Sequence, residues 1–173
     1  MNQLQFSLTV PSAAIRTLDE AEVAIPAGLR SRPAHTASSS ETDAEPLPVQ
    51  QVRFCSAHDG TGLAYSIIGE GPPLVKTANW LNHLEHDWDS PVWRHWIRHI
   101  IGYRQLIRYD ERGNGLSDWN APEISFEAFV DDLASVVDAA GLDSFDLFGV
   151  SQGCSVAIAY AVRNPGRVRK MVL

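Results

Sequence analysis

With 173 residues, of which 45% are hydrophobic and 20% charged, the chain has the composition of a single globular domain rather than of a disordered or fibrous protein. Its formal net charge of −7 provides no general attraction to the phosphate backbone of nucleic acids. No segment approaches the ~18 apolar residues of a membrane span, and the N-terminus lacks the basic start and apolar run of a signal peptide. We therefore expect no nucleic-acid binding, no membrane contact and no signal-directed export.

The two cysteines, Cys55 and Cys154, are far apart in the sequence. Such spacing predicts neither a disulfide framework nor a zinc site, because both need closely grouped ligands. We expect a protein of the reducing cytoplasm.

The first fifty residues have little hydrophobic periodicity, and the stretch RSRPAHTASSSETDAEPLPVQ has few large apolar side chains. Such a stretch cannot bury enough apolar surface to offset the entropy lost on ordering. We expect residues 1–50 to form a disordered or linker-like arm and residues 51–173 to form the folded domain.

Two segments with alternating apolar and polar residues, 50–57 and 63–69, enclose the turn sequence HDGTG. This pattern predicts an antiparallel hairpin. Residues 74–78 predict a third strand. A loop is expected to follow, with His83, His86 and the acidic sequence EHDWD in it.

A helix is expected after this loop. Ser90 suits its N-cap, and Pro91 suits the first helical position because the missing N–H would have no partner there. His95 and His99 have a spacing that suits a metal, but no third ligand accompanies them, and a solvent-exposed helix face is the favoured interpretation. One buried face is predicted from apolar residues at spacings of three and four: Val92, Trp93, Trp96, Ile97 and Ile100.

Residues 103–110 predict a fourth strand, and a loop with several glycines follows it. Ser125 is expected to cap a long helix that ends at Gly141. The buried stripe of this helix is predicted to contain its apolar residues at helical spacing: Phe126, Phe129, Val130, Leu133, Val136, Val137 and Ala140.

Residues 145–150 predict a fifth strand, whose continuous apolar character suits a sheet covered on both faces. A helix over 152–163 and a sixth strand from residue 167 follow. Strands that alternate with helices predict an α/β fold with a mostly parallel, doubly wound sheet. Because the sequence stops within the sixth strand, we expect an exposed apolar sheet edge that is open to self-association.

The sequence GVSQG, residues 149–153, lies between the fifth predicted strand and the helix that follows it. A serine in such a G-x-S-x-G turn is strained and exposed, and the glycines leave room for the adjoining strand and helix. Backbone N–H groups at the start of the helix would point toward an oxyanion. Ser151 is therefore the candidate nucleophile and the N–H of Gln152 the first candidate oxyanion donor. The alternative is a turn that only connects two elements.

A second motif supports this interpretation. The sequence YDERGNGLSD places a D-x-R-G-x-G-x-S loop after the fourth strand, made of Asp110, Arg112, Gly113, Gly115 and Ser117. With both motifs in this order, residues 51–173 resemble the N-terminal portion of the α/β-hydrolase fold family, apparently truncated after the sixth strand. A dinucleotide-binding fold competes poorly, because Asp118 occupies the position of the third glycine in G-x-G-x-x-G.

The resemblance implies a serine hydrolase of the esterase or acyl-hydrolase class, which acts on a small ester-like molecule without a metal or organic cofactor. In the family, a residue after the third strand donates a second N–H to the oxyanion. Trp80 is the matching candidate here, and the Asn79 side chain is another. The usual His-Gly pair of the family is replaced by Ala78 and Asn79. Asp110 is expected to brace its loop, as is Arg112.

Family members place an acid and then a histidine after the serine, but no Asp, Glu or His follows Ser151 in this sequence. For the upstream His83 and His86, a structural role in the loop or pocket is favoured over catalysis, because no orienting acid is identifiable. Tryptophans such as Trp96 are expected to belong to the core more than to a substrate pocket.

Three hypotheses about function follow. The preferred one is the N-terminal part of an acyl hydrolase, with little triad-driven activity of its own. The second is a non-catalytic ligand-sensing or interaction module, because residues 75–96, VKTANWLNHLEHDWDSPVWRHW, are similar to hydrolase-like modules associated with bacterial transcriptional regulators or adenylate cyclases. The third is an incomplete gene product without a function.

Overall fold

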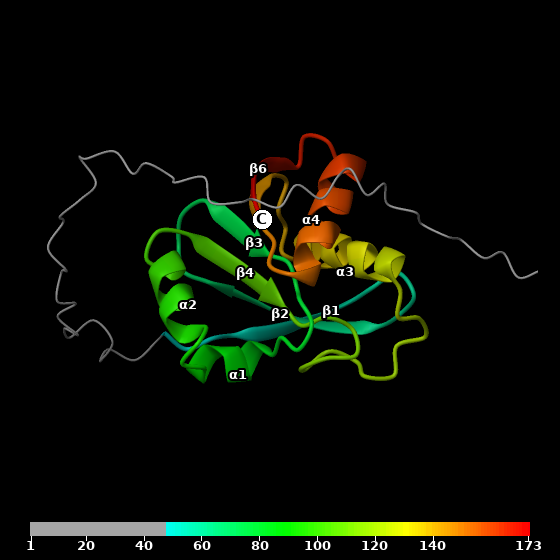
Figure 1. Ribbon diagram of the computed structural model, residues 1–173, viewed down its shortest axis with the longest axis horizontal. Helices are drawn as coiled ribbons and strands as arrows, with labels where there is room; N and C mark the ends of the chain where they lie inside the picture. The colour runs from blue at the N-terminus through cyan, green and yellow to red at the C-terminus, as the bar shows by residue number, and fades with distance from the viewer. Residues whose placement is uncertain (1–47) are drawn as a thin grey trace, which may run out of the picture. The chain divides into compact units, whose positions relative to one another are not determined.

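The computed structural model describes residues 48–173, so the predicted arm over 1–50 lies almost entirely outside the described residues. One sheet organises these residues, and its six strands have the order β1-β2-β4-β3-β5-β6 (Figure 1). The strands are β1 (Val52–Ser56), β2 (Gly62–Ile68), β3 (Pro73–Lys76), β4 (Gln105–Tyr109), β5 (Phe145–Phe148) and β6 (Val168–Val172).

The pairing of the strands confirms the predicted α/β fold. β1 and β2 form the expected antiparallel hairpin, and β2 also pairs antiparallel with β4. The remaining neighbours, β4 with β3, β3 with β5, and β5 with β6, are parallel. The carboxyl ends of the four parallel strands therefore lie at one edge of the sheet, where ligands of open α/β sheets bind.

Helices cover both faces of the sheet, as a doubly wound fold requires. α1 (Leu84–Asp89) and α2 (Arg94–Ile101) lie on one side, and α3 (Phe126–Ala139) and α4 (Gln152–Arg163) on the other (Figure 1). None of the helices in residues 48–173 has the length and apolar character needed to cross a bilayer. The core lies mainly between the sheet and α3 and α4, and its fully buried side chains include Leu63, Val75, Ile107, Leu133, Val136, Phe145, Leu147 and Tyr160.

The helix α1 corrects the prediction of a loop over residues 83–89. His83 is its N-cap, and the His83 Nδ1 accepts hydrogen bonds from the N–H groups of Glu85 and His86 at 3.2 and 3.4 Å. Leu84 and Asp87 are buried. The prediction of a loop over these residues is therefore wrong, because Leu84 and Asp87 are buried and His83 caps a helix.

The helix α2 begins at Arg94, later than predicted. The Oγ of Ser90 accepts from the N–H of Val92 at 3.2 Å, and the Ser90 carbonyl accepts from the N–H of Arg94 at 2.8 Å. These bonds form a turn before the helix, so Ser90 caps a turn instead of the helix itself. Of the predicted apolar face only Ile97 is buried. Trp96 is 44% exposed and stacks on Phe148, so its assignment to the core is wrong.

The long helix α3 forms as predicted. The Oγ of Ser125 accepts from the N–H of Ala128 at 3.2 Å, and Gly141 follows the helix with a φ of 69°. Most of the predicted stripe is buried or partly buried, but Phe126 is 43% exposed. Phe126 is the first residue of the helix, and its helical spacing matched the stripe although the rest of the protein does not cover it.

The apolar edge expected at β6 is exposed. Met171, Val172 and Leu173 are 39%, 60% and 55% accessible. Beside this edge an apolar groove of about 520 Å³ separates α2 from the strands, lined by Leu74, His95, Trp96, His99, Ile100, Phe148 and Val172.

The loop after β4 extends the sheet alongside β2. The N–H of Asp110 donates to the Ala64 carbonyl at 2.9 Å, and the N–H of Ala64 donates to the Ser117 Oγ at 2.9 Å. Further along, Gly62 and Asp118 exchange two bonds, from the Gly62 N–H to the Asp118 carboxylate and from the Asp118 N–H to the Gly62 carbonyl. Residues 110–118 thus occupy the place of a neighbouring strand where β4 has ended.

A buried guanidinium holds the other side of this loop. Arg112 is 2% exposed and binds both carboxylate oxygens of Asp132 on α3, at 2.6 and 2.8 Å. Its Nη1 also donates to the carboxylate of Asp59 at 2.7 Å and to the Glu123 carbonyl at 2.9 Å. The β1–β2 turn, the loop after β4 and α3 therefore share one cation. This confirms the expected bracing role of Arg112.

The Asp132→Asn variant should lose about 3 kcal/mol of unfolding free energy, because it leaves a buried guanidinium without its main counter-charge. Asp138→Asn is the matched control on the same helix, since Asp138 pairs with Arg167 at the surface and is 65% exposed. The control should stay within about 1 kcal/mol of the unsubstituted protein. Urea unfolding would measure both, and equal losses in the two variants would contradict the prediction.

Candidate active site

Ser151 lies in a strained turn between β5 and α4. Its φ of 54° and ψ of −124° place a non-glycine residue in a sparsely populated region of backbone space, and its side chain is exposed. Within residues 48–173 only Leu81, with a φ of 62°, shares a positive φ without being glycine. The strain and exposure are those expected of a serine at a nucleophile elbow.

The glycines on either side of Ser151 are required by close packing. A Cβ on Gly153 would lie 2.3 Å from the Thr77 Oγ1 and 2.7 Å from the Ala78 carbonyl oxygen. A Cβ on Gly149 would lie 2.8 Å from the Cα of Cys154. The sequence prediction that side chains would clash at these two positions is therefore confirmed.

The loop after β3 packs against the start of α4. The Oγ1 of Thr77 donates to the Gly153 carbonyl at 3.0 Å and to the Phe148 carbonyl at 3.3 Å. The same loop carries Trp80, which is 69% exposed. The first N–H groups of a helix have no acceptor within the helix, so the N–H of Gln152 is available at this point. Both predicted oxyanion donors thus belong to segments that meet at the turn.

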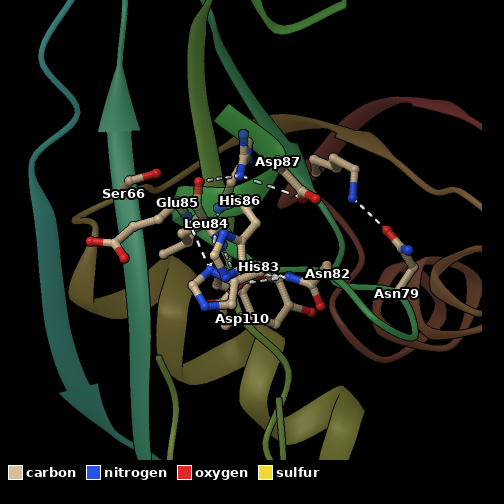
Figure 2. Close-up of polar contacts among 12 residues, drawn as sticks. Ser66, Asn79, Asn82, His83, Leu84, Glu85, His86, Asp87 and Asp110 are labelled. Carbon is tan, nitrogen blue, oxygen red and sulfur yellow. Dashed lines mark hydrogen bonds and ion pairs between the residues drawn. The ribbon is translucent and has the colours of Figure 1, made fainter. Parts of the chain in front are cut away.

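The Asn79 side chain is engaged in other contacts. Its Oδ1 accepts from the Lys76 Nζ at 2.6 Å, and its Nδ2 donates to the Trp80 carbonyl at 3.1 Å. Figure 2 shows Asn79 pointing toward this amine, away from Asp110. These contacts favour the Trp80 N–H over the Asn79 amide as the second oxyanion donor.

Burial lowers the pKa of Lys76 to about 8, and its amine lies 5.5 Å from the centre of the Trp93 ring.

Asp110 joins the two loops at the carboxyl ends of β3 and β4. Its Oδ1 accepts from the Leu84 N–H at 2.8 Å and the Asn82 Nδ2 at 2.9 Å (Figure 2). Its Oδ2 accepts from the Leu116 N–H at 2.8 Å. Burial raises the pKa of Asp110 to about 6, and the hydrogen bonds from the Leu116 and Leu84 N–H groups act in the opposite direction. Asp110 therefore braces the loops, as expected.

His83 and His86 have structural surroundings. Their rings are 4.1 Å apart, and the His83 Nδ1 is occupied by the two N–H groups at the start of α1. A nitrogen that accepts from the backbone is not available to take a proton from a serine. The geometry supports the structural interpretation of both histidines.

Sequence reasoning missed the residue that contacts the turn most directly. The Oε1 of Glu111 accepts from the Gln152 Nε2 at 2.6 Å, and its Oε2 accepts from the Asn114 Nδ2 at 3.1 Å. Burial raises the pKa of Glu111 to about 7, the charge of Asp132 adds to this, and the two amide hydrogen bonds oppose it. The available signal was an acidic residue inside the D-x-R motif, which alone does not indicate a contact 41 positions along the chain.

No group of three or more potential metal ligands occurs within residues 48–173, and Cys55 and Cys154 are both free thiols. The residues gathered at the turn are instead a serine, backbone N–H groups and a buried carboxyl group. This set can form a covalent bond to an electrophile and stabilise an oxyanion. The fold and the site together define an α/β protein with a nucleophile-elbow geometry.

Comparison with known proteins agrees with this class. Residues 81–173 match the α/β hydrolase fold family. The chain is 33% identical over 119 residues to the 2-hydroxymuconate semialdehyde hydrolase of Pseudomonas sp. (strain CF600), covering 67% of this chain and 38% of that protein. It is 34% identical over 121 residues to a non-heme haloperoxidase of Rhodococcus erythropolis, covering 69% and 42%.

Among solved structures, the esterase RhEst1 from Rhodococcus sp. ECU1013 superposes with a TM-score of 0.59 and 30% identity, covering 70% of this chain and 44% of that chain. A hydrolase from Pseudomonas aeruginosa superposes with a TM-score of 0.62 at 24% identity, over 71% and 45%. This chain belongs to the α/β hydrolase fold family. It spans about two fifths of the length of the curated relatives that it matches.

The Gly153→Ala variant should lose about 2 kcal/mol of unfolding free energy, because the new methyl group must displace the backbone of the loop after β3. Gly102→Ala is the control, since a Cβ there would have only an ordinary 3.5 Å contact with the His99 carbonyl. The control should change stability by less than about 1 kcal/mol. Denaturant unfolding would compare the two variants. A Gly153→Ala variant as stable as the control would contradict the prediction, because it would mean that the loop after β3 moves to accommodate the methyl group at little cost.

Proposed function

We propose that this chain is the nucleophile-bearing part of a serine hydrolase of the esterase or acyl-hydrolase class. The observation that carries the proposal is the backbone of Ser151, whose positive φ exposes the side chain at the carboxyl edge of the parallel strands. Such strain is maintained only where the surrounding packing determines it, and it is concentrated at functional sites.

In the proposed reaction, the Oγ of Ser151 attacks the carbonyl carbon of the substrate and gives up its proton to a base. The negative charge on the carbonyl oxygen accepts hydrogen bonds from the N–H of Gln152 and the N–H of Trp80. The intermediate then expels the alkoxide, which takes back the proton held by the base and leaves as the alcohol, and an acyl-serine remains. Attack by water breaks the acyl bond and restores the hydroxyl group.

The base and the acid that orients it are proposed to come from polypeptide outside these 173 residues, because no Asp, Glu or His follows Ser151 here. The exposed edge of β6 is the surface on which such polypeptide, or a second copy of the chain, would add. Alone, the chain should retain only the catalysis that binding and oxyanion stabilisation supply.

The proposed substrate is a small ester-like molecule. The named relatives include a hydrolase of 2-hydroxymuconate semialdehyde and an esterase, which supports a small acyl substrate. Trp80 and Leu81 are 69% and 68% exposed and offer apolar contact area near the turn. No metal or organic cofactor is needed for this chemistry. The free cysteines support a reducing compartment, and we place the protein in the cytoplasm.

A non-catalytic sensor of a transcriptional regulator is the second candidate. It is favoured by the loop after β3, where Asn79 replaces the glycine typical of the family and is tied to Lys76. A loop fixed in this way can bind a ligand whether or not the ligand is then turned over.

Without the proposed base, a fluorophosphonate probe should still phosphorylate Ser151 in the purified chain, but slowly, because only the strained turn and the oxyanion donors assist the reaction. Fluoride and the serine proton are lost, and mass spectrometry would locate the adduct. Ser151→Ala should abolish labelling. Ser155→Ala is the matched control, because Ser155 is also exposed on α4 and its hydroxyl donates to the Gln152 carbonyl at 2.8 Å. The control should label at the rate of the unsubstituted protein.

Absence of labelling in a folded sample, even after prolonged exposure to the probe, would reject the nucleophile assignment for this chain and favour the sensor. Labelling that persists in Ser151→Ala would show that another nucleophile reacts.

A further inference from the structure

Glu111 is a buried carboxyl group beside the turn that the proposed reaction does not use. It is 5% exposed and follows Asp110 directly after β4. Its contact with the Gln152 Nε2, at 2.6 Å, reaches the first residue of α4. Within residues 48–173, no other acidic side chain forms a hydrogen bond with residues 149–153.

The surroundings of Glu111 come from several elements. Its hydrogen-bond partners are neutral amides, Asn114 from its own loop and Gln152 from α4. From α3, Asp132 adds a negative charge, which is shared with the guanidinium of Arg112. Tyr109, whose side chain is buried, is the last residue of β4 and lies two positions before Glu111. A carboxyl group in this position has neutral partners and a negative neighbour.

The charge state of Glu111 acts on the same residue that donates to the oxyanion. The Gln152 side chain bonds to the carboxyl group, and the Gln152 N–H would face the substrate oxygen. A carboxyl group accepts a hydrogen bond in either protonation state, so the side-chain contact persists while the charge changes. The Glu111 carboxyl group contacts the side chain of the residue whose N–H would bind the oxyanion, and a negative charge in a partly desolvated site opposes a second one more strongly than in bulk water.

We propose that Glu111 is a positioning residue for the reaction at Ser151: it holds Gln152 in place, and its ionisation slows the reaction by opposing the charge that develops at the Gln152 N–H. This inference rests on the proposed nucleophilic role of Ser151. Glu111 thereby makes the reaction rate depend on pH, although the backbone N–H groups that stabilise the oxyanion do not titrate.

The direction of the pH dependence follows from the raised pKa of Glu111, about 7. An acid with a raised pKa keeps its proton to a higher pH, so Glu111 is neutral below about pH 7 and charged above it. Glu111 therefore does not slow the reaction at low pH, and it slows the reaction fully at high pH. The base that activates a serine has the opposite dependence, since it works only after losing its own proton.

The test compares the rate of fluorophosphonate labelling at Ser151 in the unsubstituted chain and in Glu111→Gln, which keeps the shape and removes the charge. Taking the ratio of the two rates cancels the titration of any shared base. The ratio of unsubstituted to variant rate should be near one at about pH 5.5 and fall about tenfold by about pH 8.5. Glu70→Gln, an exposed site in the β2–β3 turn, is the charge-matched control and should give a constant ratio.

A ratio for Glu111→Gln that stays constant with pH, while the adduct forms in both proteins, would overturn this inference and leave Ser151 as the nucleophile. Absence of an adduct in both proteins at every pH would overturn the proposed function, and the inference with it.

The unsubstituted protein provides a second measurement that needs no variant. The side-chain amide resonances of Gln152 should shift with a midpoint near the pKa of Glu111, about 7, and an unchanged position across the titration would contradict the contact.

Discussion

The carboxylate of Asp110 is the acceptor on which the carboxyl edge of the parallel strands, where the candidate active site lies, depends. Two segments leave the sheet there, one after β3 and one after β4, and Asp110 is the side chain that joins them. Asp110 takes hydrogen bonds from the Leu84 N–H and the Asn82 amide of the first loop and from the Leu116 N–H of the second. Buried backbone donors need such acceptors, and one fully buried side chain supplies them for both loops.

The strained turn at Ser151 is maintained by contacts on both sides. The Thr77 hydroxyl bonds the carbonyl groups of Phe148 and Gly153, and the Gly149 N–H donates to the Val172 carbonyl at 2.9 Å. These bonds join the turn to β3 and to β6. A single unfavourable backbone conformation can therefore persist, because changing it would break several hydrogen bonds. Rigid support on neighbouring strands is the usual requirement for a site that stabilises developing charge.

The sheet and the serine turn could be predicted because their signals are local. Alternating apolar residues indicate the first two strands, a continuous apolar run indicates the fifth, and the two glycines around Ser151 indicate a turn without room for side chains. α1 could not be found in this way, since the burial of its Asp87 depends on Arg108 from β4, 3.6 Å away in the ion pair. The exposure of Trp96 was missed because helical spacing predicts a face but not what covers it. The contact between Glu111 and Gln152 joins the loop after β4 to the start of α4, which only the folded sheet brings together.

The pairing of residues 110–118 with β2 fixes the register of the N-terminal hairpin. A slip of one residue in β2 would turn its side chains to the opposite faces of the sheet, and it would also separate Ala64 from Ser117 and Gly62 from Asp118. A Cβ on Gly62 would lie 2.9 Å from the Asp118 carboxylate and would displace that side chain from its bond to the Gly62 N–H. The motif that borders the candidate active site therefore also determines how the first two strands of the sheet align, and the hairpin has only one position in which the loop can close.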